Sequence, residues 1–183
     1  MPRPGEPLAA FPFAALRRTP DIEAPGLVAV DAADRLILDE SASARADAAA
    51  DEIVVIGDAY GALALGAAWE LAARDRRGTG RVRVHQDALM GERAIAANAA
   101  GLGLADVVAP SPALDAALVT GARVVLMRLP RSLDALRDIA GLIAERAAPD
   151  VAVFAGGRIK HMTRAMNDVL GAFFARVDVT HAR

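Results

Sequence analysis

The chain lacks cysteine, long apolar runs and a large excess of either charge. Without cysteine among its 183 residues it cannot form disulfide bonds, and a structural zinc site is disfavoured. The three histidines, His85, His161 and His181, show no metal-ligand spacing, so we expect no bound metal. No apolar run approaches the roughly 18 residues of a membrane-spanning helix, and no charged-then-apolar leader opens the chain. These absences predict a cytoplasmic protein without membrane contact.

The composition is that of an ordinary soluble globular protein, with 54% hydrophobic and 24% charged residues. A chain of this length buries enough surface to form its own core. Its formal net charge is −2, so the molecule as a whole is not attracted to nucleic acid. Any RNA contact must therefore come from a local basic patch.

Proline is concentrated at the start of the chain. Because proline removes a backbone donor and blocks helix continuation, this predicts an irregular lead-in that packs on the core. The segment Asp31–Leu38 has the pattern of a short helix opened by an acidic cap, and Ser41–Asp51 would join it to the first strand. We therefore treat residues 1–52 as a lead-in with one short helix, and residues 53–183 as an α/β domain.

From residue 53 onward, short β-branched runs alternate with longer helical ones. This alternation predicts repeated βαβ units, hence an α/β fold with a central, mostly parallel sheet and helices on both faces. The expected strands are Ile53–Gly57, Arg81–Gln86, Asp106–Val108, Arg123–Leu129, Val151–Ala155 and Arg176–His181. The expected helices are Ala62–Arg74, Ala88–Ala100, Pro112–Val119, Ser132–Arg146 and His161–Phe174.

The loops after the strands are where such a sheet binds ligands. After the first strand, Gly57, Asp58 and Gly61 form a weak version of a cofactor-binding turn, which usually carries more glycine. The simpler interpretation is a plain strand-to-helix turn. After the second strand, Gln86 stands where a ribose-binding carboxylate is expected and Asp87 comes one residue late, so Asp87 is as readily a helix N-cap. Tyr60 lies in the first of these loops, where packing is favoured over contact with a base.

Cations gather where the fourth and fifth strands end and the next helices begin. They are Arg128, Arg131, Arg158, Lys160, His161 and Arg164. Cations oppose the dipole at a helix start, by roughly 0.3–1 kcal/mol each, so this placement favours a functional reason such as phosphate contact. The alternative is a set of ordinary solvated side chains, some paired with Asp134, Asp138 or Asp168. A second basic run, Arg74–Arg81, is expected to be a solvated loop at the other end of the sheet.

Several segments together resemble one enzyme family. The run from His85 to Gly103 resembles the post-strand helix of class I methyltransferases in the "methyltransferase small" family. The segments Asp31–Asp34, Gly57–Leu63 and Leu129–Leu133 are similar to the amino-terminal domain of that family's tandem-domain ribosomal RNA guanine-N2 methyltransferases. The resemblance spans about residues 27–181 and implies a Rossmann-like methyltransferase fold.

The resemblance also implies that this chain is the non-catalytic half of such an enzyme. Catalytic members end the fourth strand with Asn-Pro-Pro-Phe or Tyr, which accepts hydrogen bonds from the target amine and stacks on the base. This chain has Met127–Arg131 there, and arginine accepts no hydrogen bond. We therefore expect no catalytic residue here, with Gly57, Asp58, Gly61 and Asp87 as a vestigial cofactor loop. S-adenosylmethionine would belong to a catalytic domain beyond residue 183, and ribosomal RNA and that domain would be the partners.

Two other functions remain open on the residues alone. The chain could itself be an S-adenosylmethionine-binding methyltransferase with divergent motifs, using Asp58, Asp87 and Arg128 near the cofactor. A nucleotide-binding oxidoreductase of Rossmann type ranks last, because its dinucleotide turn needs a fuller glycine pattern.

Overall fold

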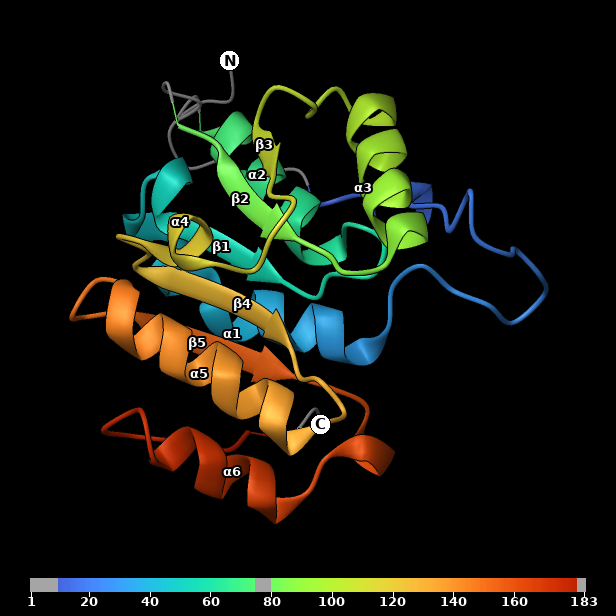
Figure 1. Cartoon of the computed structure of the whole chain (residues 1–183). Coiled ribbons are helices and arrows are strands. Elements are labelled where there is room, and N and C mark those ends of the chain that lie inside the picture. Colours follow the sequence, from blue (N-terminus) through green and yellow to red (C-terminus); the bar gives the residue numbers. More distant parts are fainter. Residues whose placement is uncertain (1–9, 75–79, 181–183) are drawn as a thin grey trace.

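The computed structural model describes residues 10–74 and 80–180 and contains a five-stranded sheet in which all pairs of neighbouring strands are parallel (Figure 1). The strand order is β3-β2-β1-β4-β5. The strands are β1 (Ile53–Ile56), β2 (Val82–His85), β3 (Val108–Pro110), β4 (Val124–Arg128) and β5 (Ala152–Gly156). The order reverses between β1 and β4, so the loops after these two strands flank the position where such folds bind ligands.

Helices cover both faces of the sheet, as the sequence predicts. They are α1 (Ala32–Asp47), α2 (Ala62–Ala73), α3 (Leu89–Gly101), α4 (Ala116–Val119), α5 (Leu133–Arg146) and α6 (Arg164–Gly171). Along β1, Ile53 and Val55 join the core beneath α1, α2 and α3, whereas Val54 and Ile56 join the core beneath α4, α5 and α6. The α/β fold class is confirmed, and β1 and β4 are buried on both faces, as central parallel strands must be.

Some predicted boundaries are wrong. The sixth strand, Arg176–His181, does not form over residues 176–180, and His181 lies outside the described residues. Val177 is only partly buried and Val179 is 55% exposed, so this alternating segment has no sheet face to cover. Helix α4 is shorter than Pro112–Val119, α6 is shorter than His161–Phe174, and β3 lies two residues later than expected. Residues 75–79 of the second basic run lie outside the described residues.

Helix α1 is the largest correction. It runs for 16 residues through the segment expected to be a linker, and it packs on β4, β5 and α2. Its buried face contains three polar residues, Asp34, Ser41 and Arg45, beside Ile37 and Leu38. Arg45 lies 2.7 Å from Glu70 of α2, and Ser41 donates a hydrogen bond to the Ile37 carbonyl oxygen. The buried stripe is thus partly polar, which hid it from a search for apolar periodicity.

We use the term lead-in from here on for residues 10–31, which precede α1. The lead-in packs against the core and contains a short 3-10 helix, η1 (Phe13–Ala15). Leu16 is buried, and the Phe11 ring lies 6.1 Å from the Trp69 ring of α2. Figure 1 shows the lead-in, in blue, passing beside α3 before it turns back to α1. Within the described ranges, no helix is long and apolar enough to cross a membrane.

Candidate functional site

The first loop at the carboxyl end of the sheet is organised by Asp58. This side chain is buried, and its carboxylate accepts hydrogen bonds of 2.9–3.0 Å from the backbone N–H groups of Gly61, Leu63 and Ala64. Gly57 and Gly61 have φ angles of +75° and +97°, which L side chains rarely adopt, so both glycines are needed for the turn. Burial raises the pKa of Asp58, and the three N–H groups oppose that rise. The carboxylate is thus committed to the start of α2.

The second loop is bonded to the first. The Gln86 side-chain amide donates to the Asp58 backbone oxygen at 2.6 Å, and its oxygen accepts from the Ala88 N–H at 3.0 Å. A Cβ atom on Gly91 would lie 2.8 Å from both the Ala59 oxygen and Gln86, so α3 begins tightly against the first loop. The N-cap interpretation of Asp87 is wrong, because Ala88 occupies that position and Asp87 instead lies 2.8 Å from His85.

The third loop begins at Arg128, at the end of β4. Its guanidinium donates to Asp31 at 2.7 and 2.9 Å and to Asp34 at 2.7 Å. Asp31 and Asp34 also form a capping box at the start of α1, in which each carboxylate accepts a backbone N–H of the other residue. We call these three residues the Arg128 clasp. It fastens α1 over the end of β4, and it commits the guanidinium and both carboxylates to one another.

The two carboxylates of the clasp titrate in opposite directions. Burial alone would raise the pKa of Asp31, but the hydrogen bonds and charge of Arg128 hold it well below its usual range. Burial raises the pKa of Asp34 to about 6, because the attraction of Arg128 does not offset desolvation, and the negative charges of Asp58 and Asp31 add to the rise. Asp34 thus carries its negative charge at a cost to stability at neutral pH.

This difference predicts a pH dependence of stability. Because the folded-state pKa of Asp34 is raised, the folded chain binds a proton that the unfolded chain does not, between about pH 6 and pH 4. From this group the free energy of unfolding rises as the pH falls through that window, by about 1 kcal/mol per pH unit. Below about pH 4, protonation of Asp31 in the unfolded chain reverses the trend.

The Asp34→Asn variant should flatten that rise. Its free energy of unfolding at pH 7 should lie within about 1 kcal/mol of the parent's or above it, because the buried charge is removed while an acceptor remains. Urea unfolding at several pH values measures both quantities. An unchanged pH profile in the variant would contradict the assignment to Asp34.

Of the six cations predicted where the fourth and fifth strands end, Arg128 is bound in the clasp and the other five are exposed. Arg131, Arg158, Lys160, His161 and Arg164 are all exposed. The pKa of His161 is lowered, first by desolvation and then by three nearby positive charges, which come from Arg131, Lys160 and Arg158. His161 thus lies within electrostatic reach of these three cations, and we call the four residues the basic rim. Arg158 also lies 3.4 Å from Asp31, so the basic rim borders the clasp.

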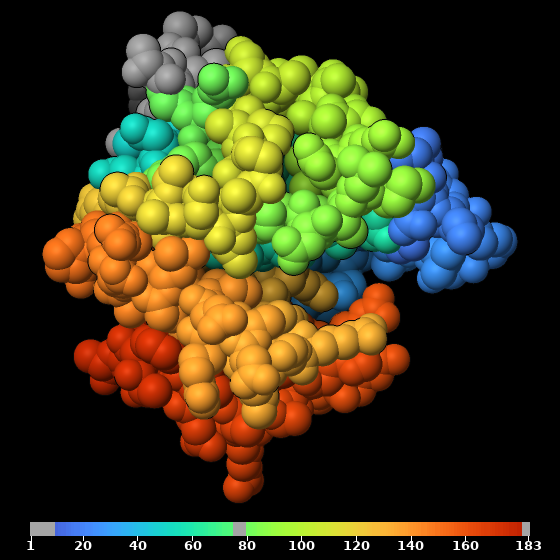
Figure 2. Space-filling model, in the orientation of Figure 1, coloured from blue at the N-terminus to red at the C-terminus, as the bar shows by residue number. Residues whose placement is uncertain are grey.

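The alternative partners foreseen for these cations are not found. In the described ranges, Asp134, Asp138 and Asp168 form no ion pair with the basic rim. Arg164 begins α6 and is likewise exposed. Figure 2 shows the orange and red segments that carry these residues below the blue lead-in, on the same side of the molecule.

The lead-in is bonded to the first loop, which the sequence did not reveal. Asn98 of α3 donates to the backbone oxygens of Arg17 and Tyr60, both at 2.8 Å, and accepts from the Arg17 N–H at 3.0 Å. Tyr60 donates its hydroxyl to Asp21 at 2.6 Å and has the Arg18 guanidinium over its ring. The signal for this contact was a buried asparagine within an alanine-rich helix. Over the residues that the structure covers, no group of three or more histidine or acidic side chains is placed to hold a metal ion.

Comparison with known proteins identifies the family. The family model described as the RLMG N-terminal domain matches residues 9–183. The chain belongs to the RLMG N-terminal domain family. The family resemblance predicted from the sequence is therefore confirmed.

The relatives of this RLMG N-terminal domain are named as ribosomal RNA large subunit methyltransferase G. The protein from Pseudomonas entomophila is 33% identical over 179 residues, which cover 97% of this chain and 45% of that protein. The protein from Pseudomonas paraeruginosa is 33% identical over 183 residues, with 97% and 46% covered. This chain thus spans about half the length of the curated relatives it matches.

A solved structure supports the fold. Coclaurine N-methyltransferase, described as bound to N-methylheliamine and SAH, superposes with a TM-score of 0.52 at 16% identity, covering 81% of this chain and 45% of that one. At that identity the likeness concerns the fold alone, and it agrees with the Rossmann-like methyltransferase fold expected for the RLMG N-terminal domain.

Proposed function

We propose that this chain is the non-catalytic half of an S-adenosylmethionine-dependent ribosomal RNA guanine-N2 methyltransferase, in which it contacts RNA and supports a separate catalytic domain. The observation that carries the proposal is the Arg128 clasp. An arginine stands where an amine-accepting group would be needed, and it is bonded to two carboxylates of α1. The setting we propose is the cytoplasm, where such an enzyme would meet its RNA.

The groups at this edge do not suit S-adenosylmethionine. A cofactor of that kind needs a free acceptor for its ribose hydroxyls after β2 and a bare turn after β1. Here Gln86 is bonded to the first loop, and the Asp58 carboxylate is saturated by three backbone N–H groups. The alternative enzyme would use Asp58, Asp87 and Arg128, and all three already have internal partners, Asp87 with His85 at 2.8 Å.

The basic rim supplies the RNA contact in this proposal. Four neighbouring side chains, three of them permanently charged, are exposed beside Gly156 and Gly157, where a backbone could approach closely. Because the chain as a whole has a net charge of −2, attraction to phosphates depends on this local concentration.

The rim can be tested with little effect on the clasp, because Arg158 reaches Asp31 only at 3.4 Å, whereas Arg128 binds the same carboxylate at 2.7 and 2.9 Å. Replacing Arg131, Arg158 and Lys160 with alanine should weaken binding to ribosomal RNA fragments by at least about tenfold. It should also reduce the slope of log affinity against log salt by about 2 to 3, because each lost phosphate contact removes about 0.7–0.9. Fluorescence anisotropy at several salt concentrations measures both.

A triple alanine variant at Arg81, Arg146 and Arg176 is the matched control. These arginines are also exposed but lie away from the rim, so their loss should leave the affinity close to the parent's. Equal affinities of the parent and the rim variant would refute the role of the basic rim.

A further inference from the structure

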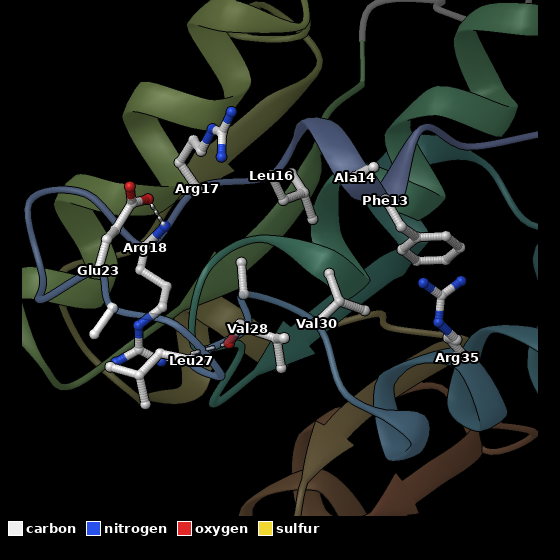
Figure 3. Close-up of a pocket in the computed structure, with 12 residues that line it drawn as sticks. Phe13, Ala14, Leu16, Arg17, Arg18, Glu23, Leu27, Val28, Val30 and Arg35 are labelled. Atoms are coloured by element: carbon white, nitrogen blue, oxygen red, sulfur yellow. Dashed lines mark hydrogen bonds between the residues drawn. The ribbon is translucent and has the colours of Figure 1, made fainter.

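A second feature on the same side of the molecule has no role in the proposed function. It is an open hollow of about 570 Å³ between the lead-in and the first turns of α1, within the size range of small-ligand pockets, roughly 300–1,000 Å³. Figure 3 shows its lining, which comes from residues 13–30 and from Arg35. We call it the lead-in hollow.

The wall of the hollow is built by Arg18. This guanidinium donates to the backbone oxygens of Ile22 and Val28 and to the Asp21 carboxylate, so it closes the lead-in into a loop. The same Asp21 accepts the Tyr60 hydroxyl, which joins that loop to the core. The hollow is therefore a fixed concavity, with its shape set by these hydrogen bonds.

Two other arginines on the lining have no acidic partner among the described residues. Neither Arg17 nor Arg35 forms an ion pair within those ranges, and both are exposed. The Arg35 guanidinium lies over the Phe13 ring, 4.1 Å from its centre. Figure 3 shows Arg17 and Arg35 on opposite sides of the hollow, with Leu16, Val28 and Val30 between them. Two cations thus flank an apolar floor.

The floor is more exposed than packing requires. Leu27 and Val28 are 47% and 56% exposed. An apolar surface between cations suits a nucleotide, whose base is an uncharged plane and whose phosphates are anionic.

The hollow and the basic rim are neighbours along α1. Asp31 caps α1 and lies 3.4 Å from Arg158 of the rim, and Arg35 comes four residues later. Four helical residues rise by about 6 Å, so a strand bound at the rim would pass the hollow within a nucleotide or two.

We propose that the lead-in hollow binds an unpaired RNA nucleotide, with its base on the apolar floor and its flanking phosphates at Arg17 and Arg35. This rests on the proposed function, because the RNA that reaches the hollow is the one held at the basic rim. The proposed substrate is therefore RNA that has a single-stranded segment next to the phosphates held by the basic rim.

The test uses a short single-stranded RNA that carries thiouridine for photo-crosslinking, with affinity measured by fluorescence anisotropy. The Arg17→Ala, Arg35→Ala double variant should bind about tenfold more weakly, with a salt slope lower by about 1.4, or about 0.7 for each phosphate contact. Crosslinks in the parent should map to residues 10–35. The control is a double alanine variant at Arg81 and Arg146, and the melting temperature verifies that each variant is folded.

The outcomes separate the two proposals. If RNA binds the parent but crosslinks only at residues 158–164, and the double variant binds RNA as tightly as the parent, the nucleotide site in the hollow is overturned. The proposed function would still stand. A parent that binds no RNA would overturn both. Hydrogen exchange is also measured without RNA. If the protection of residues 11–35 then grows with protein concentration, the hollow is a contact surface between protein molecules, and the proposed nucleotide site is overturned.

Discussion

Replacing Arg128 with alanine should lower the free energy of unfolding by about 3 kcal/mol, because it leaves two carboxylates facing each other beneath α1 without their cation. The side chains of Arg128, Asp31 and Asp34 are 19%, 22% and 11% exposed, so the charges are only weakly screened by solvent. Urea unfolding of the two proteins at pH 7 measures the difference.

A surface arginine at the opposite end of β4 serves as the control. Arg123 immediately precedes β4 and pairs with Asp150 at 3.1 Å, but the two side chains are 43% and 63% exposed. Its alanine variant should lose less than about 1 kcal/mol, as exposed ion pairs do. Losses of similar size in both variants would contradict the role of the clasp.

A second substitution identifies the cause of the loss. Asp34→Asn in the Arg128→Ala background should restore part of the lost stability, because it removes a buried charge that has no partner. If the double variant is less stable than Arg128→Ala alone, the loss came from packing and not from unpaired charge.

The positions of the strands and the parallel character of the sheet follow from the sequence because the physical signals are local. Short apolar runs such as Val124–Met127 are typical of central parallel strands, and the helices between the strands are long enough for right-handed crossovers. The turn at Gly57 and Gly61 was also predictable, since positive φ favours glycine. Five of the six predicted strands and both helical faces were found in this way.

The clasp could not be predicted because its partners are far apart in the chain. Arg128 lies 97 residues from Asp31 and 94 from Asp34, and neither carboxylate carries a local sign of that contact. The sequence placed Arg128 with five other cations and, separately, assigned the acidic pair to a helix cap. Both assignments describe real positions, but only the structure shows that the carboxylates bind the arginine.

The lead-in was underestimated for a similar reason. Its prolines predicted an irregular segment, but the contacts that fix it run from Asn98 and Tyr60 to Arg17 and Asp21. These are single hydrogen bonds between distant residues and leave no periodic trace. The hollow, which depends on them, could be found only from the structure.

The proposed non-catalytic role depends on one condition. The hydrogen-bonding groups of the loops at the carboxyl edge of the sheet must be so fully paired with one another that no methyl donor can bind. Isothermal titration of the chain with S-adenosylmethionine tests this directly, with a catalytic class I methyltransferase as the positive control. We predict no saturable heat up to millimolar ligand, a free energy of binding weaker than about −4 kcal/mol. Saturable binding with a dissociation constant near about 1 μM, or about −8 kcal/mol, would contradict that role.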